Sequence, residues 1–80
     1  MDIKAKIKQT LVSLLKLRPE EIKDDINLSD GIGVDSTEMV ETLIALEKAF
    51  GVKLSPQEIT KFSTINEIAQ NIQGKLAENK

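Results

Sequence analysis

The chain lacks several of the residue types on which protein chemistry usually depends. Its 80 residues include no Cys, His, Trp or Tyr, and Phe50 and Phe62 are the only aromatic side chains. Without Cys there is no disulfide framework, no thiolate nucleophile and no Cys-ligated metal. Without His the chain lacks the side chain that most often moves protons near neutral pH and binds zinc. The composition therefore argues against a self-sufficient enzyme.

Long apolar runs and a basic surplus are also missing. No apolar run approaches the roughly 20 residues that span a bilayer, and the first residues, Met1 to Lys4, do not begin a signal peptide. We therefore expect no stable membrane insertion and a cytoplasmic location. The formal net charge is −2, which argues against a nucleic-acid partner, because phosphate binding needs a basic surface. Length and a hydrophobic content of 40% fit a single domain over residues 1–80 with a modest core.

The net charge conceals an uneven distribution of charged side chains. Residues 1–18 have a net charge of +4, residues 19–50 of −7, and residues 51–80 of +1. The acidic side chains in the middle of the chain are either solvated helix faces or a docking surface that attracts basic partners. Composition alone leaves both interpretations open.

Apolar residues recur at helical spacing in three segments. Residues 3–17 are the first predicted helix, with Asp2 as N-cap and an end enforced before Pro19. Residues 36–50 are the second, closed by Gly51. The third begins after Ser63 or Thr64, and its apolar stripe consists of Ile65, Ile68, Ala69, Ile72 and Leu76.

The connections between these helices differ in kind. Residues 18–35 lack a clear period and predict a long loop, with one helical turn over residues 19–22 and a tight chain path at Gly31 and Gly33. Ser55 and Pro56 predict the start of a short helix within residues 54–59. The fold class is therefore all-α: a small four-helix bundle of three main helices and one short helix, with a long first loop.

Oxygen-bearing side chains in the central segment raise the question of a metal site. An EF-hand loop that starts at Asp25 would place Asp30 where Gly is required and Ser36 where Glu is required. Because this register and the neighbouring one both fail, we predict no metal site. A DNA-reading helix is also excluded, since residues 36–50 carry three Glu and one Lys and would repel phosphates.

Asp35 and Ser36 lie where the second main helix begins. Asp35 followed by Glu38 has the form of a capping box, so the Ser36 hydroxyl is not required as the cap. Ser36 is then either an ordinary helix-start serine or a nucleophile that a partner enzyme modifies with a phosphate-linked group. The free N–H groups and dipole of a helix N-terminus would stabilise such a phosphodiester. Local chemistry alone favours the ordinary serine.

The wider pattern resembles the acyl carrier protein family. The resemblance is carried by the run from Ile32 to Glu41, then by Ala45 to Glu47 and Phe50, and it covers nearly the whole chain. The family pattern is a Gly, one residue, Asp-Ser, and an acidic and apolar helix that ends near Phe. The resemblance implies that Ser36 receives 4′-phosphopantetheine from coenzyme A, that Asp35 matches the preceding aspartate, and that the chain has no catalytic activity of its own.

The same resemblance implies a function and a set of partners. The thiol of the arm would carry acyl or aminoacyl groups as thioesters in fatty-acid, polyketide, lipid or nonribosomal peptide synthesis. Partners would be a phosphopantetheinyl transferase, an acyl-loading ligase or acyltransferase, and synthase or condensing enzymes, each bound briefly by a monomer. The alternative is an unmodified helical protein–protein docking module. The expected docking residues are Thr37, Glu38, Glu41, Ile44, Glu47 and Lys48.

Two positions depart from the family pattern. Position 37 is often Leu and is Thr here, and position 48 is often acidic and is Lys here. Fatty-acid carriers are usually more acidic than −2, and Lys48 would weaken docking to basic enzyme surfaces, so we expect a specialised carrier. The aliphatic core could also open a cleft for an acyl chain, although for each residue taken alone an ordinary core position is the favoured interpretation. The expected cleft residues are Val40, Leu43, Leu46, Phe62, Ile68 and Ile72.

Overall fold

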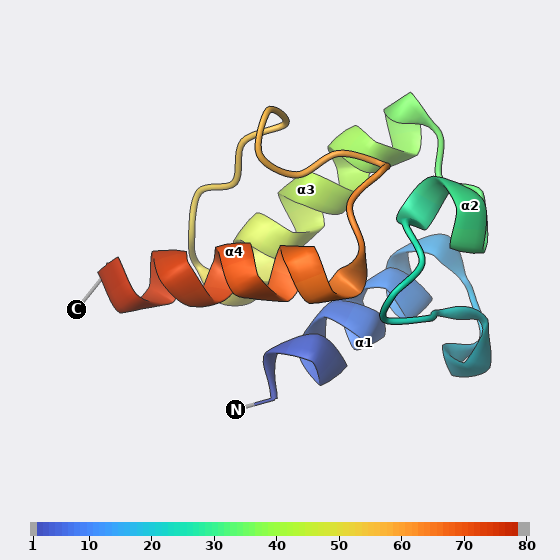
Figure 1. Cartoon of the computed structure of the whole chain (residues 1–80), viewed down its shortest axis with the longest axis horizontal. Coiled ribbons are helices and arrows are strands. Elements are labelled where there is room, and N and C mark those ends of the chain that lie inside the picture. The colour runs from blue at the N-terminus through green and yellow to red at the C-terminus, as the bar shows by residue number, and fades with distance from the viewer. Residues whose placement is uncertain (1, 79–80) are drawn as a thin grey trace.

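A computed structural model describes residues 2–78 as a bundle of helices joined by irregular segments (Figure 1). The helices are α1 (Ile3–Leu15), α2 (Leu28–Ile32), α3 (Ser36–Phe50) and α4 (Ile65–Glu78), with a 3₁₀ turn η1 (Pro19–Glu21). Helix α1 packs against both α3 and α4. The predicted all-α bundle is confirmed. None of the helices described is long and apolar enough to cross a membrane.

The apolar stripes of the three long helices meet in one core. Residues whose side chains expose no surface come from α1, α3 and α4: Ile7, Leu11, Leu46, Ile65, Ile68 and Ile72. Burial of such side chains is the main favourable contribution to folding. Thr42 is also fully buried, and its Oγ1 donates a hydrogen bond of 2.8 Å to the carbonyl oxygen of Glu38. The buried hydroxyl is therefore satisfied within its own helix.

Side-chain caps begin the long helices where the sequence predicts them. Asp2 Oδ1 accepts a hydrogen bond of 3.1 Å from the Ala5 amide at the start of α1. At the start of α4, Thr64 Oγ1 accepts from the Glu67 amide at 3.1 Å, and Glu67 Oε1 accepts from the Thr64 amide at 2.9 Å. This reciprocal pair identifies Thr64, rather than Ser63, as the cap of the last helix.

Helix α1 ends earlier than predicted. The sequence predicted a helix over residues 3–17, ended by Pro19, but the helix stops at Leu15 because Lys16 adopts a left-handed conformation with φ +56°. The Val12 carbonyl accepts the hydrogen bond of the Leu17 amide at 3.1 Å in this turn. The turn returns Leu17 to the edge of the core, where it is partly buried. Proline therefore starts the following turn η1, as predicted, but does not set the end of α1.

The short helix lies in a different connection from the one predicted. No helix forms at residues 54–59, where the amides of Glu58 and Ile59 bond to the Ser55 carbonyl in one turn that does not continue. The short helix is α2, inside the segment that was predicted as a loop. Asn27 caps it, since its Oδ1 accepts from the Asp30 amide at 2.8 Å, and Gly33 ends it. Five residues are too few to show an apolar period, so the sequence signals for this helix are only the capping residue Asn27 and the terminating Gly33.

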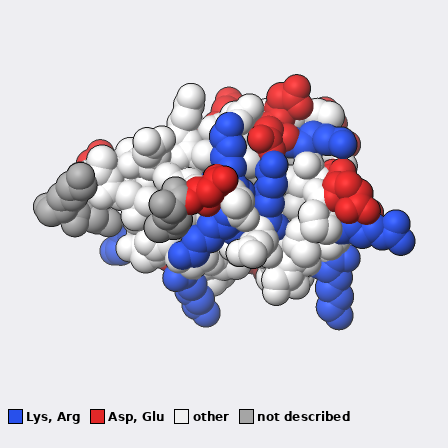
Figure 2. Space-filling view, turned by 90° about the horizontal axis from the view of Figure 1, so that it is seen from below, with Lys and Arg blue, Asp and Glu red and all other residues white. Residues whose placement is uncertain are grey.

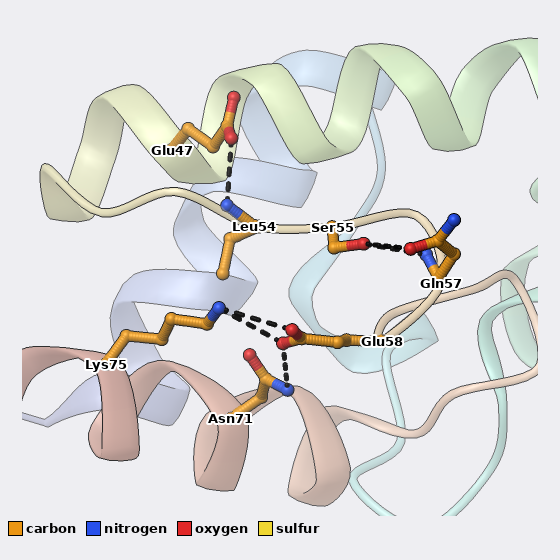
Figure 3. A network of polar contacts seen from close by, with 7 residues as sticks. All are labelled: Glu47, Leu54, Ser55, Gln57, Glu58, Asn71 and Lys75. Carbon is orange, nitrogen blue, oxygen red and sulfur yellow. Dashed lines mark hydrogen bonds and ion pairs between the residues drawn. The ribbon is translucent and has the colours of Figure 1, made fainter.

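The α3–α4 connection (residues 51–64) has little regular structure but is held at several points (Figure 3). Glu47 Oε2 on α3 accepts a hydrogen bond of 2.8 Å from the Leu54 amide. Glu58 accepts from Asn71 Nδ2 at 3.0 Å and pairs with Lys75 Nζ at 3.2 Å, both on α4. Near its end the connection meets α2, because the Ser29 amide donates to the Lys61 carbonyl at 2.8 Å. Polar contacts to three helices thus hold this connection against the bundle.

Lys and Arg side chains gather on one side of the molecule (Figure 2). In Figure 2 the underside, on which α1 lies in Figure 1, shows many Lys and Arg side chains and fewer acidic ones. Lys8 forms an ion pair with Asp24, and the Nζ atom of Lys6 lies 5.1 Å from the centre of the Phe50 ring. Within residues 2–18, Lys8 thus pairs with an acidic side chain, whereas Lys6 lies against an aromatic ring.

Candidate functional site

The turn between α2 and α3 places Asp35 and Ser36 at an exposed end of the bundle. Gly33 adopts the left-handed conformation with φ +69°, and its amide bonds to the Ser29 carbonyl at 3.1 Å. The next residue, Val34, is buried, with 2% of its surface exposed, and its amide bonds to the Leu28 carbonyl. The chain is therefore anchored immediately before residue 35, and the first turn of α3 has a fixed position.

The predicted capping box is present, and it leaves the Ser36 hydroxyl unused. Asp35 Oδ1 accepts a hydrogen bond of 2.8 Å from the Glu38 amide, and Glu38 Oε1 accepts one of 3.2 Å from the Asp35 amide. Ser36 occupies the first helical position and is exposed. Within residues 2–78 its hydroxyl makes no hydrogen bond, so it is available to a reactant that approaches from solvent.

An apolar groove of about 270 Å³ begins beside Ser36. One wall is formed by α3, and the other by the α3–α4 connection. Val40 and Phe62, one on each wall, are 56% and 65% exposed, which is high for large apolar side chains in a small domain. The complete lining is Ser36, Met39, Val40, Leu43, Pro56, Ile59, Thr60, Lys61 and Phe62.

The residues around the groove can be compared with the chemistry of a phosphopantetheine arm. An exposed hydroxyl at the start of a helix suits a phosphodiester, because free amides and the helix dipole favour negative charge there. Lys61 adds a basic group to the groove lining. The apolar walls suit the carbon chain of a thioester cargo. The residues present therefore fit this group.

Three of the six residues expected to line an acyl cleft lie along this groove. Val40, Leu43 and Phe62 line the groove, whereas Leu46, Ile68 and Ile72 are fully buried core residues and do not reach it. Residues 56 and 59–61 form much of the second wall. The sequence predicted a short helix within residues 54–59 and gave none of these four residues a place in the site. The available signal was the set of apolar residues in this irregular stretch: Val52, Leu54 and Ile59, all buried.

The six predicted docking residues fall into two groups on α3. Thr37, Glu41, Ile44 and Lys48 are exposed, and Ile44 exposes 47% of its surface. Glu38 and Glu47 are half-buried, and their carboxylates accept backbone hydrogen bonds at the helix start and from the α3–α4 connection. The structure therefore places four of the six on the outer surface and gives the other two a structural role.

The oxygen-bearing side chains of residues 24–38 bond to nearby groups of the fold and do not gather around a common metal position. Asp24 pairs with Lys8, and Asn27 and Asp30 bond to one another at the start of α2. Among the residues described, no three acidic side chains are arranged to hold a metal ion.

Glu58 provides a test of how the second wall is held. The hydrogen bond from the Asn71 amide, with that from Lys75, lowers the pKa of the Glu58 carboxyl. A carboxylate whose pKa is lowered by folding stabilises the fold above the pKa of the unfolded chain, and this contribution is lost as the pH falls through the folded-state pKa. We expect Glu58→Gln to be less stable than the wild type at neutral pH, and the difference to shrink in acid, as measured by urea denaturation at several pH values.

The control for this prediction is Glu20→Gln, which removes an exposed carboxylate of η1. Its stability should follow that of the wild type across the pH range. A difference between Glu58→Gln and the wild type that is the same in acid and at neutral pH would contradict the role of the ionised Glu58 carboxylate.

Comparison with known proteins gives a consistent result. Residues 5–72 match the family model described as "Phosphopantetheine attachment site". The chain is 32% identical to an acyl carrier protein of Wolinella succinogenes over 67 residues, which cover 84% of this chain and 88% of that protein. It is 32% identical over 74 residues to one of Buchnera aphidicola subsp. Acyrthosiphon pisum (92% of each chain), and 29% identical over 76 residues to one of Thermosynechococcus vestitus (95% of this chain, 94% of the other).

Proposed function

Because the chain belongs to the acyl carrier protein family, whose members bear a phosphopantetheine arm and catalyse nothing themselves, we propose that Ser36 is the residue that carries the arm. One observation supports this choice above all. The Ser36 hydroxyl is exposed and unused at the start of α3, beside an apolar groove, while Asp35 performs the capping.

Each part of the site has a role in this proposal. The Ser36 Oγ atom forms the new bond to the phosphorus that bears the pantetheine arm, and the phosphoanhydride bond of coenzyme A breaks. Adenosine 3′,5′-bisphosphate leaves with the bond's electron pair, and the hydroxyl proton passes to a base of the transferase. Asp35 holds the first turn of α3 in place, and the free amides of that turn favour the anionic phosphodiester. When the arm is attached, its thiol supplies the thioester chemistry, and the groove beside Ser36 accommodates apolar cargo.

The cargo and the partner enzymes are a finer part of the proposal. We infer a specialised carrier in polyketide, nonribosomal peptide or modified-lipid synthesis, because Thr37 and Lys48 replace the apolar and acidic residues common at these positions. Its partners are then a phosphopantetheinyl transferase, a loading ligase or acyltransferase, and a condensing enzyme. A monomeric carrier domain over residues 1–80, and a cytoplasmic location, are predictions that accompany this proposal.

Intact mass provides the test. The apo protein is incubated with coenzyme A and a broad-specificity phosphopantetheinyl transferase, and proteolytic fragments are then compared. We expect one added phosphopantetheinyl group per chain, located on the fragment that contains Ser36. Substitution of an acyl coenzyme A should add the acyl group as a thioester that hydroxylamine removes. An unmodified chain would support the docking module instead, and an adduct on another residue would contradict the assignment of Ser36.

A further inference from the structure

Among the residues described, Lys61 is the one charged side chain that lines the groove beside Ser36. It is half-buried, and its Nζ atom lies 5.4 Å from the centre of the Phe62 ring on the second wall. An ammonium group that faces an exposed aromatic ring is held only weakly. Within residues 2–78 the Lys61 ammonium has no carboxylate partner. The groove therefore contains a positive charge that no acidic side chain of the described chain neutralises.

Hydrogen bonds fix the turn that carries Lys61. The Thr60 amide donates to Ser63 Oγ at 3.1 Å, and the Ser63 amide donates to the Thr60 carbonyl at 3.0 Å. The Phe62 amide donates to Thr60 Oγ1 at 3.1 Å. Hydroxyl side chains that bond to nearby backbone groups in this way stabilise turns. The backbone of Lys61 therefore has a defined position, although it belongs to an irregular segment.

Helix α2 ties this turn to the turn that precedes Ser36. The Ser29 amide donates to the Lys61 carbonyl at 2.8 Å, and the Ser29 carbonyl accepts from the Gly33 amide at 3.1 Å. Leu28 makes a second link of the same kind between the two turns. In Figure 1 the α3–α4 connection runs back towards α2 before α4 begins. The turn of Lys61 and the turn before Ser36 therefore keep a fixed separation.

A phosphodiester on Ser36 would lie next to carboxylates that cannot move away. Asp35 and Glu38 accept hydrogen bonds from backbone amides in the capping box, which keeps both carboxylates at the start of α3. These like charges repel a phosphodiester, whereas the free amides of the helix start and a nearby cation attract it. Lys61 is the cation that shares a groove with Ser36. Lysine binds phosphate groups as a point charge on a flexible side chain.

On the premise of the proposed carrier function, we propose that Lys61 is a positioning residue for the arm, and that its ammonium pairs with the phosphodiester on Ser36. This pair directs the first part of the arm towards the side of α3 on which the groove lies. It leaves the apolar lining open to cargo. Because the pair is exposed to water, it biases the arm between groove and solvent and does not lock it. A weak bias suits a carrier that several enzymes must reach in turn.

The test locates the arm by nuclear magnetic resonance on protein whose modification at Ser36 has been confirmed by mass. Because the chain has no Cys, a neutral maleimide spin label reacts with the arm thiol alone. We expect the label to cause strong paramagnetic relaxation at the amides of Val40 and Phe62. Lys61→Gln, which keeps the aliphatic part of the side chain, should reduce this relaxation about twofold to fivefold at low salt. Lys61→Arg keeps the charge and should retain it.

Salt provides a second measurement, which needs no variant. In the wild type, added salt should lower the relaxation at Val40 and Phe62, because it screens the pair. In Lys61→Gln it should have little effect. The matched control is Lys53→Gln, which removes an exposed lysine of the same connection that does not line the groove. This variant should behave like the wild type.

Several results would overturn the role of Lys61. These are equal relaxation in the wild type and Lys61→Gln, an equal loss in Lys61→Gln and Lys61→Arg, or relaxation that does not depend on salt. A loss in Lys53→Gln as large as that in Lys61→Gln would contradict it as well. Every sample has been shown by mass to carry the arm on Ser36, so a failure of the attachment itself is recognised before this comparison begins.

Discussion

Ser36→Ala is expected to abolish attachment of the arm completely and to leave the fold intact. No hydrogen bond within residues 2–78 uses the Ser36 hydroxyl, and Ala is well tolerated in the first turn of a helix. The free energy of unfolding should therefore change by no more than about 0.5 kcal/mol. Intact mass after incubation with coenzyme A and the transferase measures the first effect, and urea denaturation measures the second. Ser13→Ala, an exposed serine on α1, should be modified like the wild type.

Substitution of the neighbouring Asp35 should, unlike that of Ser36, lower the stability of the fold. Asp35→Ala removes the acceptor for the Glu38 amide and should lower the stability by about 1 kcal/mol. Asp35→Asn keeps an acceptor oxygen and should retain most of that stability, because Asn is also a good N-cap. If Ser36→Ala proved as destabilising as Asp35→Ala, the separation of capping from modification would be wrong.

Leu46→Ala is expected to cause the largest loss of stability among the substitutions considered. Leu46 exposes no surface at the centre of the core, and removal of a buried Leu side chain costs about 2–5 kcal/mol. A domain of this length has a total stability of about 4–12 kcal/mol, estimated from about 0.05–0.15 kcal/mol per residue. The variant should unfold at a much lower urea concentration, as measured by far-ultraviolet circular dichroism.

Ile44→Ala is the matched control, because it truncates an aliphatic residue on the same helix two positions away. Ile44 is half exposed, and its truncation should change the stability by only about 0.5 kcal/mol. Similar losses for the two variants would contradict the assignment of Leu46 to the core and of Ile44 to the outer surface.

Much of the fold could be predicted where local rules and burial agree. The period of apolar residues predicted α3 and α4, and the reciprocal Asp35–Glu38 pair located the first turn of α3. The cap of α4 was left between Ser63 and Thr64, and the structure selects Thr64. The end of α1 could not be predicted, because Lys16 adopts a left-handed conformation that lysine rarely takes. Helix α2 is short, and its position depends on contacts with residues 61–64, far away in the sequence.

In the site too, features set by adjacent residues could be predicted, and features set by distant segments could not. Ser36 and its separation from the cap follow from adjacent residues, so the sequence was sufficient for that geometry. The second wall of the groove comes from the α3–α4 connection, whose path is set by Glu47 on α3 and by Asn71 and Lys75 on α4. A shallow recess beside Ile44 likewise needs Leu14 from α1. Neither the second wall nor the recess is marked by a pattern of adjacent residues, because each depends on how distant segments pack.

The packing of α1 against α4 has a consequence for the order in which the molecule is built. Helix α1 is synthesised first, yet two of its buried residues, Ile7 and Leu11, share a core with Ile65, Ile68 and Ile72 of the last helix. Contacts between such distant segments form late, because the intervening loop must close first. A growing chain on the ribosome can cover part of the apolar face of α1 with α3, but the part that packs against α4 stays exposed until most of α4 has emerged. The second wall of the groove beside Ser36 is completed by the same closure, because Asn71 and Lys75 of α4 hold Glu58 of the α3–α4 connection.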